Sequence, residues 1–334
     1  MENKGPNKKT NGMLSWFKMS EFIFPLTIRL IFAIVSSVIT TTVFALLVTI
    51  ILLYDNLVPV PQFAAKAISK QLSHGTFGLY FEEARIFVSL NSNWHPRLTF
   101  DGLRMKNAIG EKPIELTRVD AIFSIRKAIG GELNISELHL DGLAVGIMRD
   151  QHGGVKAQIG SMPQETGDVA KPSDLKLQFD RVFQLPFLES FKTLSVQNVT
   201  IDYSDGRSLR RWIVDGGRLH VFKRENQLSI RSDLALLTGG AGVSIIEANY
   251  RGEVGRKKAD FGLKFSDLPA DIIATQSSGF AWLAAFDAPL SGALRGTLNE
   301  DGTLGPLKST LDFAGGVLRP GSGSKALQFS SVKT

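Results

Sequence analysis

The longest uninterrupted apolar stretch of the chain lies near its N-terminus. From Leu30 to Tyr54 no residue carries a formal charge, and apolar side chains would surround a helix formed by this stretch on nearly all sides. Such a helix needs lipid or a very large protein core around it. Roughly 25 residues at helical rise are long enough to cross the hydrocarbon core of a bilayer. The pattern therefore predicts one membrane-spanning helix over residues 30–54.

The flanks of this stretch indicate an uncleaved signal anchor. A cleaved signal peptide is the main alternative, but its apolar region usually has about 7–15 residues and ends at small side chains. Here the run is longer and exits through Tyr54 and Asp55. Positive residues precede the run, so the positive-inside rule places the basic tail, residues 1–29, in the cytoplasm and everything after Asp55 on the other side. The residues expected at the membrane interfaces are Trp16, Lys18, Arg29 and Tyr54.

A linker with one short amphipathic helix follows the anchor over residues 55–75. Between Gln62 and Ser73, apolar side chains repeat at helical spacing and lysines lie opposite them. The helix could cover the end of a sheet or lie on a membrane surface. Its apolar face is small for interfacial binding, which favours the first interpretation.

From Thr76 onward, short runs of alternating apolar and polar residues predict a mainly β fold. We expect an elongated, twisted antiparallel sheet with one or two short helices. An aperiodic stretch, residues 161–176, is expected to be an exposed loop between a first β lobe, 76–160, and a second, 177–334. A helix is expected near 270–286, broken around Ser278.

Asp-Gly pairs recur between or beside the predicted strands, and their positive φ angles suit tight hairpin turns. The pairs are Asp101-Gly102, Asp141-Gly142, Asp205-Gly206, Asp215-Gly216 and Asp301-Gly302. Segments 98–105, 138–145 and 194–201 resemble one another, because each has apolar residues at its first, third, sixth and eighth positions. The alternation changes phase in the middle of each segment, so the strand on each side can direct its apolar side chains to the same interior. A sealed β-sandwich would show the same alternation.

Candidate chemistry is sparse in this sequence. It contains no cysteine, and its five histidines form no metal-binding pair such as HExxH. No nucleophile elbow or Walker loop occurs. We therefore expect no enzyme activity, no metal and no cofactor. The net charge of +6 does not indicate nucleic-acid binding, because five positive and two negative side chains up to Arg29 account for +3 of it.

The order of a basic tail, a signal anchor, a short helix and turn-rich strands resembles the AsmA-like superfamily, and within it the YhdP-type proteins. The resemblance is carried by segments 138–145 and 148–154, by the glycine-rich alternation of 289–304 and by Gly315-Gly316-Val317-Leu318. It implies an inner-membrane anchor, a periplasmic bulk and an open β-groove with an apolar wall. Such a groove carries phospholipid between the inner and outer membranes and has no catalytic residues. The implied partners are inner-membrane lipids, phospholipid in the groove and other envelope proteins.

The phase changes select the side chains expected to line the groove. They are Phe100, Leu103, Leu140, Leu143, Val196 and Val199. If about 15 strands stack about 4.8 Å apart, the groove is roughly 70 Å long, which is short for a complete bridge unless partners or further sequence extend it. A non-catalytic envelope scaffold, or an assembly factor that regulates outer-membrane biogenesis, would need the same anchor and strands and remains the alternative. An exported enzyme is disfavoured, because no convergent polar groups mark a pocket.

Overall fold

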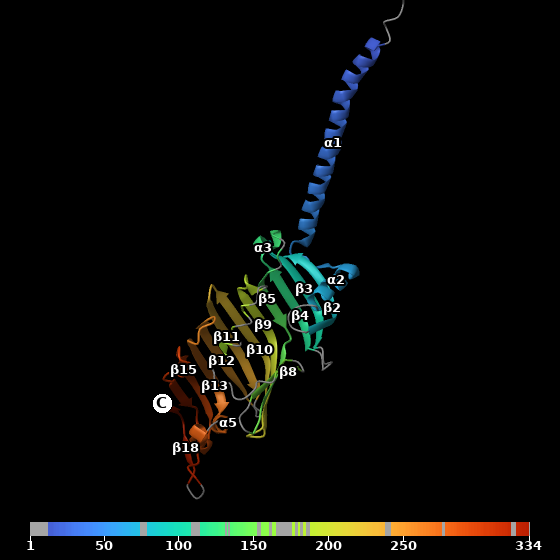
Figure 1. Cartoon of the computed structure of the whole chain (residues 1–334). Helices are drawn as coiled ribbons and strands as arrows, with labels where there is room; N and C mark the ends of the chain where they lie inside the picture. Colours follow the sequence, from blue (N-terminus) through green and yellow to red (C-terminus); the bar gives the residue numbers. More distant parts are fainter. Residues whose placement is uncertain are drawn as a thin grey trace, which may run out of the picture. The chain divides into compact units, whose positions relative to one another are not determined.

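The structure is a computed structural model, and the cartoon in Figure 1 follows it along the whole chain. The residues it describes are 13–73, 79–107, 114–130, 132, 134–151, 155–159, 162–164, 176–177, 180, 183–184, 188–237, 242–275, 278–321 and 325–333. The chain divides into two compact units, Met1–Asn56 and Leu57–Thr334.

The first unit is dominated by one long helix, α1 (Met13–Leu53). Its portion Ile28–Leu53 has a mean hydropathy of 2.4 and no buried residue, and it is the one candidate membrane span among the described residues. Hydroxyl groups inside the span bond back to the helix: the Oγ1 of Thr42 donates to the carbonyl of Val38 and that of Thr49 to Ala45, both at 2.8 Å. The helix begins well before the apolar run. The predicted single apolar helix is confirmed.

The second unit is built around a sheet that has 16 strands among the described residues. These are β1 (Val58–Pro59), β2 (Leu79–Leu90), β3 (Pro96–Asn107), β4 (Ile114–Phe123), β5 (Ile135–Asp141), β6 (Ala144–Arg149), β7 (Val155–Ile159), β8 (Met162–Gln164), β9 (Thr193–Asp205), β10 (Arg210–Arg224), β11 (Gln227–Leu237), β12 (Val243–Glu253), β13 (Ala259–Pro269), β15 (Pro289–Leu298), β16 (Lys308–Phe313) and β19 (Val332–Lys333). The predicted mainly β fold is confirmed.

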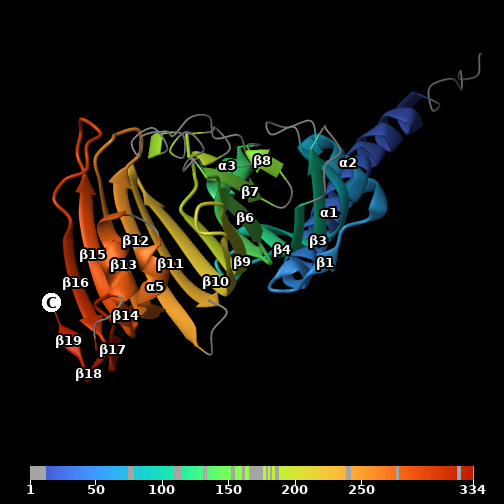
Figure 2. The same ribbon diagram turned by 90° about the horizontal axis from the view of Figure 1, so that it is seen from below.

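The strands follow their order in the sequence, except where β6, β7 and β8 branch off. The main path runs β1-β2-β3-β4-β5-β9-β10-β11-β12-β13-β15-β16-β19, and Figure 2 shows the neighbouring strands in this succession. All pairs are antiparallel except the pair of β5 with β9 and the pair of β6 with β9, which are parallel. Strands that the sequence assigned to two lobes, 76–160 and 177–334, therefore belong to one sheet.

Short helices and a small second sheet pack on this sheet. Helix α2 (Gln62–Ser73) places Ala65 and Ile68 against Ile86 and Phe100, so it covers the sheet as expected. Helix α3 (Ile125–Ile129) joins β4 to β5. Helices α5 (Ala270–Ala274) and η2 (Ser278–Ala285) lie where a broken helix was predicted. The small sheet consists of β14 (Phe286–Asp287), β17 (Gly316–Leu318) and β18 (Leu327–Phe329).

Three Asp-Gly pairs lie within or between continuing strands instead of at hairpin turns. Gly102 is inside β3 with φ +67° and Gly216 is inside β10 with φ +70°. Gly142, with φ +83°, joins β5 to β6 along the same neighbour, β9. The turn prediction was wrong at these sites, because a positive φ serves an in-strand kink as well as a hairpin. Asp205-Gly206 and Asp301-Gly302 lie where the chain reverses, between β9 and β10 and between β15 and β16.

Candidate functional site

One face of the sheet is apolar across ten neighbouring strands. Direct cross-strand partners form a row along this face, and each side chain in a row points to the same side of a pleated sheet. The row from β2 to β15 is Ile86, Phe100, Val119, Leu140, Val196, Leu219, Ser232, Ala248, Leu263 and Leu294. A second row, two residues along each strand, is Val88, Leu98, Ala121, Leu138, Leu194, Val221, Ile230, Tyr250, Phe261 and Gly296. We call the side that carries these two rows the apolar face.

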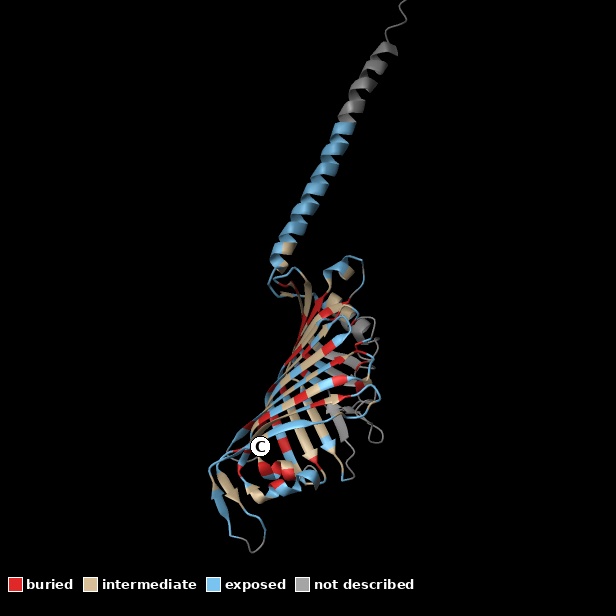
Figure 3. Ribbon diagram, turned by 90° about the vertical axis from the view of Figure 1, so that its left-hand side faces the viewer, coloured by how far each residue is buried: buried red, intermediate tan, exposed pale blue. Residues whose placement is uncertain are grey.

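The opposite side, which we call the polar face, has a row of the other kind. On the other side of the strands from β3 to β16 lie Thr99, Asp120, His139, Ser195, His220, Arg231, Asn249, Gly262, Arg295 and Lys308, and the member of this row on β2 is Phe87. The alternation of the sequence is therefore an alternation between two chemically distinct sides of one sheet. Figure 3 shows the buried positions recurring from strand to strand.

All six predicted groove residues are wholly or partly buried in this sheet. Phe100, Leu103, Leu140 and Leu143 belong to one cluster with Ile86 and Val119, which are also buried. Val196 is the direct partner of Leu140 on the parallel strand β9, and it is 1% exposed. Val199, also buried, follows Asn198, whose φ of +52° shifts the alternation by one residue. The predicted outward neighbour, His139, is in the polar row.

The phase changes lie close to one line across the strands from β3 to β10, with β4 as an uninterrupted strand between the first two. Gly102 of β3, Gly142 after β5, Asn198 of β9 and Gly216 of β10 all have positive φ, and the pairing brings neighbouring members to within one or two residues of register. Bulges of this kind bend a strand and increase its twist. A line of them keeps the apolar side chains on one face while the sheet curves.

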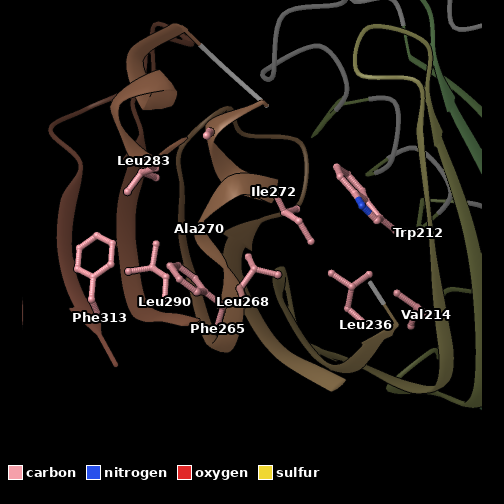
Figure 4. Close-up of a cluster of buried hydrophobic side chains, with 11 residues drawn as sticks. Trp212, Val214, Leu236, Phe265, Leu268, Ala270, Ile272, Leu283, Leu290 and Phe313 are labelled. Atoms are coloured by element: carbon pink, nitrogen blue, oxygen red, sulfur yellow. The ribbon is translucent and has the colours of Figure 1, made fainter. Parts of the chain in front are cut away.

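Separate groups of side chains pack on parts of the apolar face. At the first strands, α2 covers Ile86 and Phe100. At the far strands, Ala270, Ile272 and Ala274 of α5 and Leu283 of η2 join a cluster with Trp212, Leu236, Phe265 and Leu290. In Figure 4, Ile272 reaches from α5 toward Trp212 and Leu236.

The third group comes from the segment before β9. We call five of its described residues the strap: Lys176, Asp180, Phe183, Leu188 and Phe191. Its apolar side chains pack on Val221, Leu228 and Val254 near one end of the strands. The Nζ of Lys176 lies 2.5 Å from Oδ2 of Asp180 and donates to the carbonyl of Glu253 at 2.9 Å. Oδ2 of Asp180 also accepts from the backbone N–H of Gly255 at 2.9 Å. A buried ion pair thus ties the strap to the turn between β12 and β13.

Burial affects one side chain beside the strap. The hydroxyl of Tyr250 and Oδ1 of Asp180 have no hydrogen-bond partner among the described residues. Burial raises the pKa of the Tyr250 phenol, and the nearby charge of Asp180 raises it further. This tyrosine therefore remains neutral at physiological pH.

The apolar face is covered less tightly at its middle and far strands. Leu219, Leu263 and Leu294 are half-buried, in contrast to Val119 and Val196 of the same row, although Leu219 packs beside the strap and Leu263 beside the α5 cluster. A β-sandwich would need a second sheet of comparable size over this face. The other sheet formed by the described residues has only three short strands.

Two glycines of β15 make room for aromatic rings on the apolar face. Gly292 is the direct partner of Phe265, and Gly296 that of Phe261. A Cβ added at Gly292 would lie 2.9 Å from Cζ of Phe265 and 2.5 Å from the carbonyl oxygen of Thr310. A Cβ added at Gly296 would lie 2.5 Å from Cζ of Phe261. Sequence reasoning read these glycines only as turn-like, because their partner rings were unknown.

The polar face brings two histidines near a serine. His139 and His220 flank Ser195, and Oγ of Ser195 lies 3.2 Å from Nδ1 of His220. The described residues contain no group of three or more metal-ligating side chains. Asp120 instead bonds to the hydroxyl of Thr99 and to Nε of Arg118. His152 lies outside the described residues.

The predicted membrane-interface residues are placed in part. Arg29 lies at the start of the candidate span and Tyr54 directly after α1, with its backbone N–H bonded to Ile50 at 3.0 Å. The side chains of Trp16 and Lys18 lie outside those described.

Comparison with known proteins adds no assignment. No protein-family model, curated protein or solved structure matches the chain. The case for function rests on the two faces of the sheet and on the apolar helix.

Proposed function

We propose that this protein is anchored in the inner membrane and binds phospholipid acyl chains along the apolar face, taking part in phospholipid transport between the inner and outer membranes. The observation that carries this proposal is the apolar row from Ile86 to Leu294, which is continuous over ten strands except for Ser232, while the row behind it from Thr99 to Lys308 is mostly polar. A soluble domain without a ligand seldom keeps such a surface incompletely covered.

The dimensions suit acyl chains. Ten strands have nine spacings of about 4.8 Å, or about 43 Å, which exceeds the roughly 30 Å thickness of a bilayer's hydrocarbon core. Each methylene removed from water contributes about 0.8 kcal/mol, so lipid tails can bind there without a specific polar contact. No catalytic residue is needed for this activity.

The proposal places the sheet on the periplasmic side, with the N-terminus in the cytoplasm. The basis is the charge difference across the span, with Lys18 and Arg29 before it and Asp55 after it. A reporter enzyme that is active only in the cytoplasm, fused after Thr334, should therefore be silent. A reporter active only outside the cytoplasm, fused at the same place, should give signal. The reverse pattern would overturn this orientation.

Lipid contact is tested by photo-crosslinking at neighbouring positions on opposite faces. A photoreactive amino acid is placed at Leu140 in one variant and at His139 in another, both in the full chain in cells. We expect covalent phospholipid at Leu140 and none at His139, because consecutive residues of a strand point to opposite sides. Leu219 and Leu294 serve as further apolar-face positions, because Phe100 and Val196 are buried inside the protein.

The envelope scaffold gives the opposite result. If variants at Leu140, Leu219 and Leu294 fold and reach the membrane but capture no lipid, the apolar face is a packing surface and the scaffold replaces lipid transport as the explanation.

A further inference from the structure

Exposed apolar side chains gather at one end of the first strands of the sheet. Trp94, in the turn between β2 and β3, is 52% exposed. Ile125 and Ile129 of α3, between β4 and β5, are 40% and 83% exposed. Antiparallel pairing of β2, β3, β4 and β5 brings these two connections to the same end of the sheet.

The chain enters the sheet at this same end. Val58 of β1 pairs with Val88, two residues before the end of β2 and three before the turn that begins at Asn91. Four residues separate Val58 from Leu53, the last residue of α1. Five peptide units span at most about 18 Å, so the chain cannot carry the start of β1 farther than that from the end of the span.

The turn that carries Trp94 is held by several hydrogen bonds. Oδ1 of the buried Asn91 accepts from the backbone N–H groups of Asn93 at 3.1 Å and His95 at 2.8 Å. The backbone N–H of Trp94 donates to the carbonyl of Asn91 at 2.8 Å. Trp94 itself has φ +62°, which is uncommon for a bulky residue and persists only where the surroundings enforce it. The backbone thus fixes a large aromatic side chain in an exposed position.

Helix α3 is also fixed, and it adds a positive charge. Nζ of Lys127 lies 3.3 Å from Glu132 and 3.2 Å from Glu189. Arg126 is exposed and has no carboxylate partner among the residues that the structure describes. Two hairpin turns farther along the same end, at Glu225-Asn226 and at Arg256-Lys257-Lys258, carry polar and charged residues instead, whereas Leu304 and Leu307 are exposed in the connection from β15 to β16. Trp94, Ile125 and Ile129 are the exposed apolar group at the strands that follow the span most closely in the sequence.

We propose that Trp94, Ile125 and Ile129 enter the headgroup region of the membrane that α1 spans, on the side where the sheet emerges, with Arg126 at the lipid phosphates. Tryptophan is favoured at this depth because its ring is apolar and its N–H is polar. Short apolar segments with a basic neighbour bind bilayer surfaces in the same way. This contact presents the first strands of the apolar face to the leaflet. The proposal depends on the membrane span and not on lipid binding by the apolar face, so either can fail alone.

The absence of cysteine permits a direct test. Single cysteines are introduced in the full chain at Trp94, Ile129, Asn226 and Leu209, and each is labelled with an environment-sensitive fluorophore. Asn226 is a control at the same end of the sheet, and Leu209, which is 86% exposed, is a control at the opposite end. The proteins are reconstituted into vesicles of phosphatidylethanolamine and phosphatidylglycerol that contain lipids brominated near the headgroup. Far-UV circular dichroism establishes that each variant is folded.

We expect blue-shifted emission and strong bromine quenching at positions 94 and 129, and neither at positions 209 and 226. Equal emission and quenching at all four positions would overturn the proposal. Labels at 94 and 129 that are shielded in cells but fully exposed in pure lipid vesicles would also overturn it, in favour of a protein partner at this surface.

Discussion

At the scale of single residues, glycines on β15 leave room for aromatic rings of the neighbouring strand on the apolar face. Gly292 lies opposite Phe265, and its hydrogen faces both the ring and the backbone of β16. A methyl group there would meet the Thr310 carbonyl oxygen at 2.5 Å, and a backbone atom cannot move aside without disturbing the strand.

Gly292→Ala should therefore lower the free energy of unfolding by about 1–3 kcal/mol, the usual cost of overpacking. Gly242→Ala is the matched control, because a Cβ there meets no atom within 4 Å and should change little. Thermal unfolding of the full chain in detergent, followed by circular dichroism, measures both. Equal melting temperatures for the two variants would contradict the prediction and show that the backbone of β16 can move to accommodate the added methyl group.

Alternation in the sequence was sufficient to select residues for one face but not to find these contacts. Phe100, Leu140 and Val196 could be grouped because each occupies the same place in a repeated pattern. Their direct pairing follows from strand register, which sets Leu140 opposite Val196. The partners of Gly292 and Gly296 depend on a strand about 30 residues away, and no local pattern specifies them.

At the scale of elements, kinks and the strap modify a regular sheet. Asp-Gly pairs were predicted as hairpin turns, yet Gly102 and Gly216 lie inside strands. The dipeptide specifies a positive φ, and the pairing of the neighbouring strands decides whether the chain reverses or continues. Local sequence therefore predicts the backbone angle but not the topology.

The strap is the element whose attachment can be tested most sharply. Lys176→Met leaves Asp180 charged, 1% exposed and without its cation. Removing one member of a buried pair typically costs about 3–5 kcal/mol, and we expect a loss of this size in the free energy of unfolding. The measurement is denaturant unfolding of the full chain in detergent.

A double variant provides the control for that loss. Lys176→Met combined with Asp180→Leu removes both charges and should recover much of the stability, although the Gly255 N–H then loses its acceptor. If Lys176→Met alone is as stable as the original protein, the ion pair does not hold the strap.

At the scale of the whole molecule, the order of the strands was less predictable than their existence. The sequence indicated two lobes with a loop between them, and the parallel pairing of β5 with β9 joins those strands instead. Parallel partners are separated by a long connection, here from Asp141 to Thr193, so neither turn signals nor alternation can identify them. The main path of 13 strands has twelve spacings, or about 58 Å, compared with the roughly 70 Å expected.

The central claim is that the apolar face forms one continuous path for lipid. Photo-crosslinking at successive members of the row, Leu140, Leu219, Leu263 and Leu294, tests it most directly when each is compared with its outward neighbour, His139, His220, Lys264 and Arg295. The account predicts covalent phospholipid at all four apolar positions and at none of the four polar ones. Lipid captured equally on both faces, or on neither, in variants that fold and reach the membrane would contradict it.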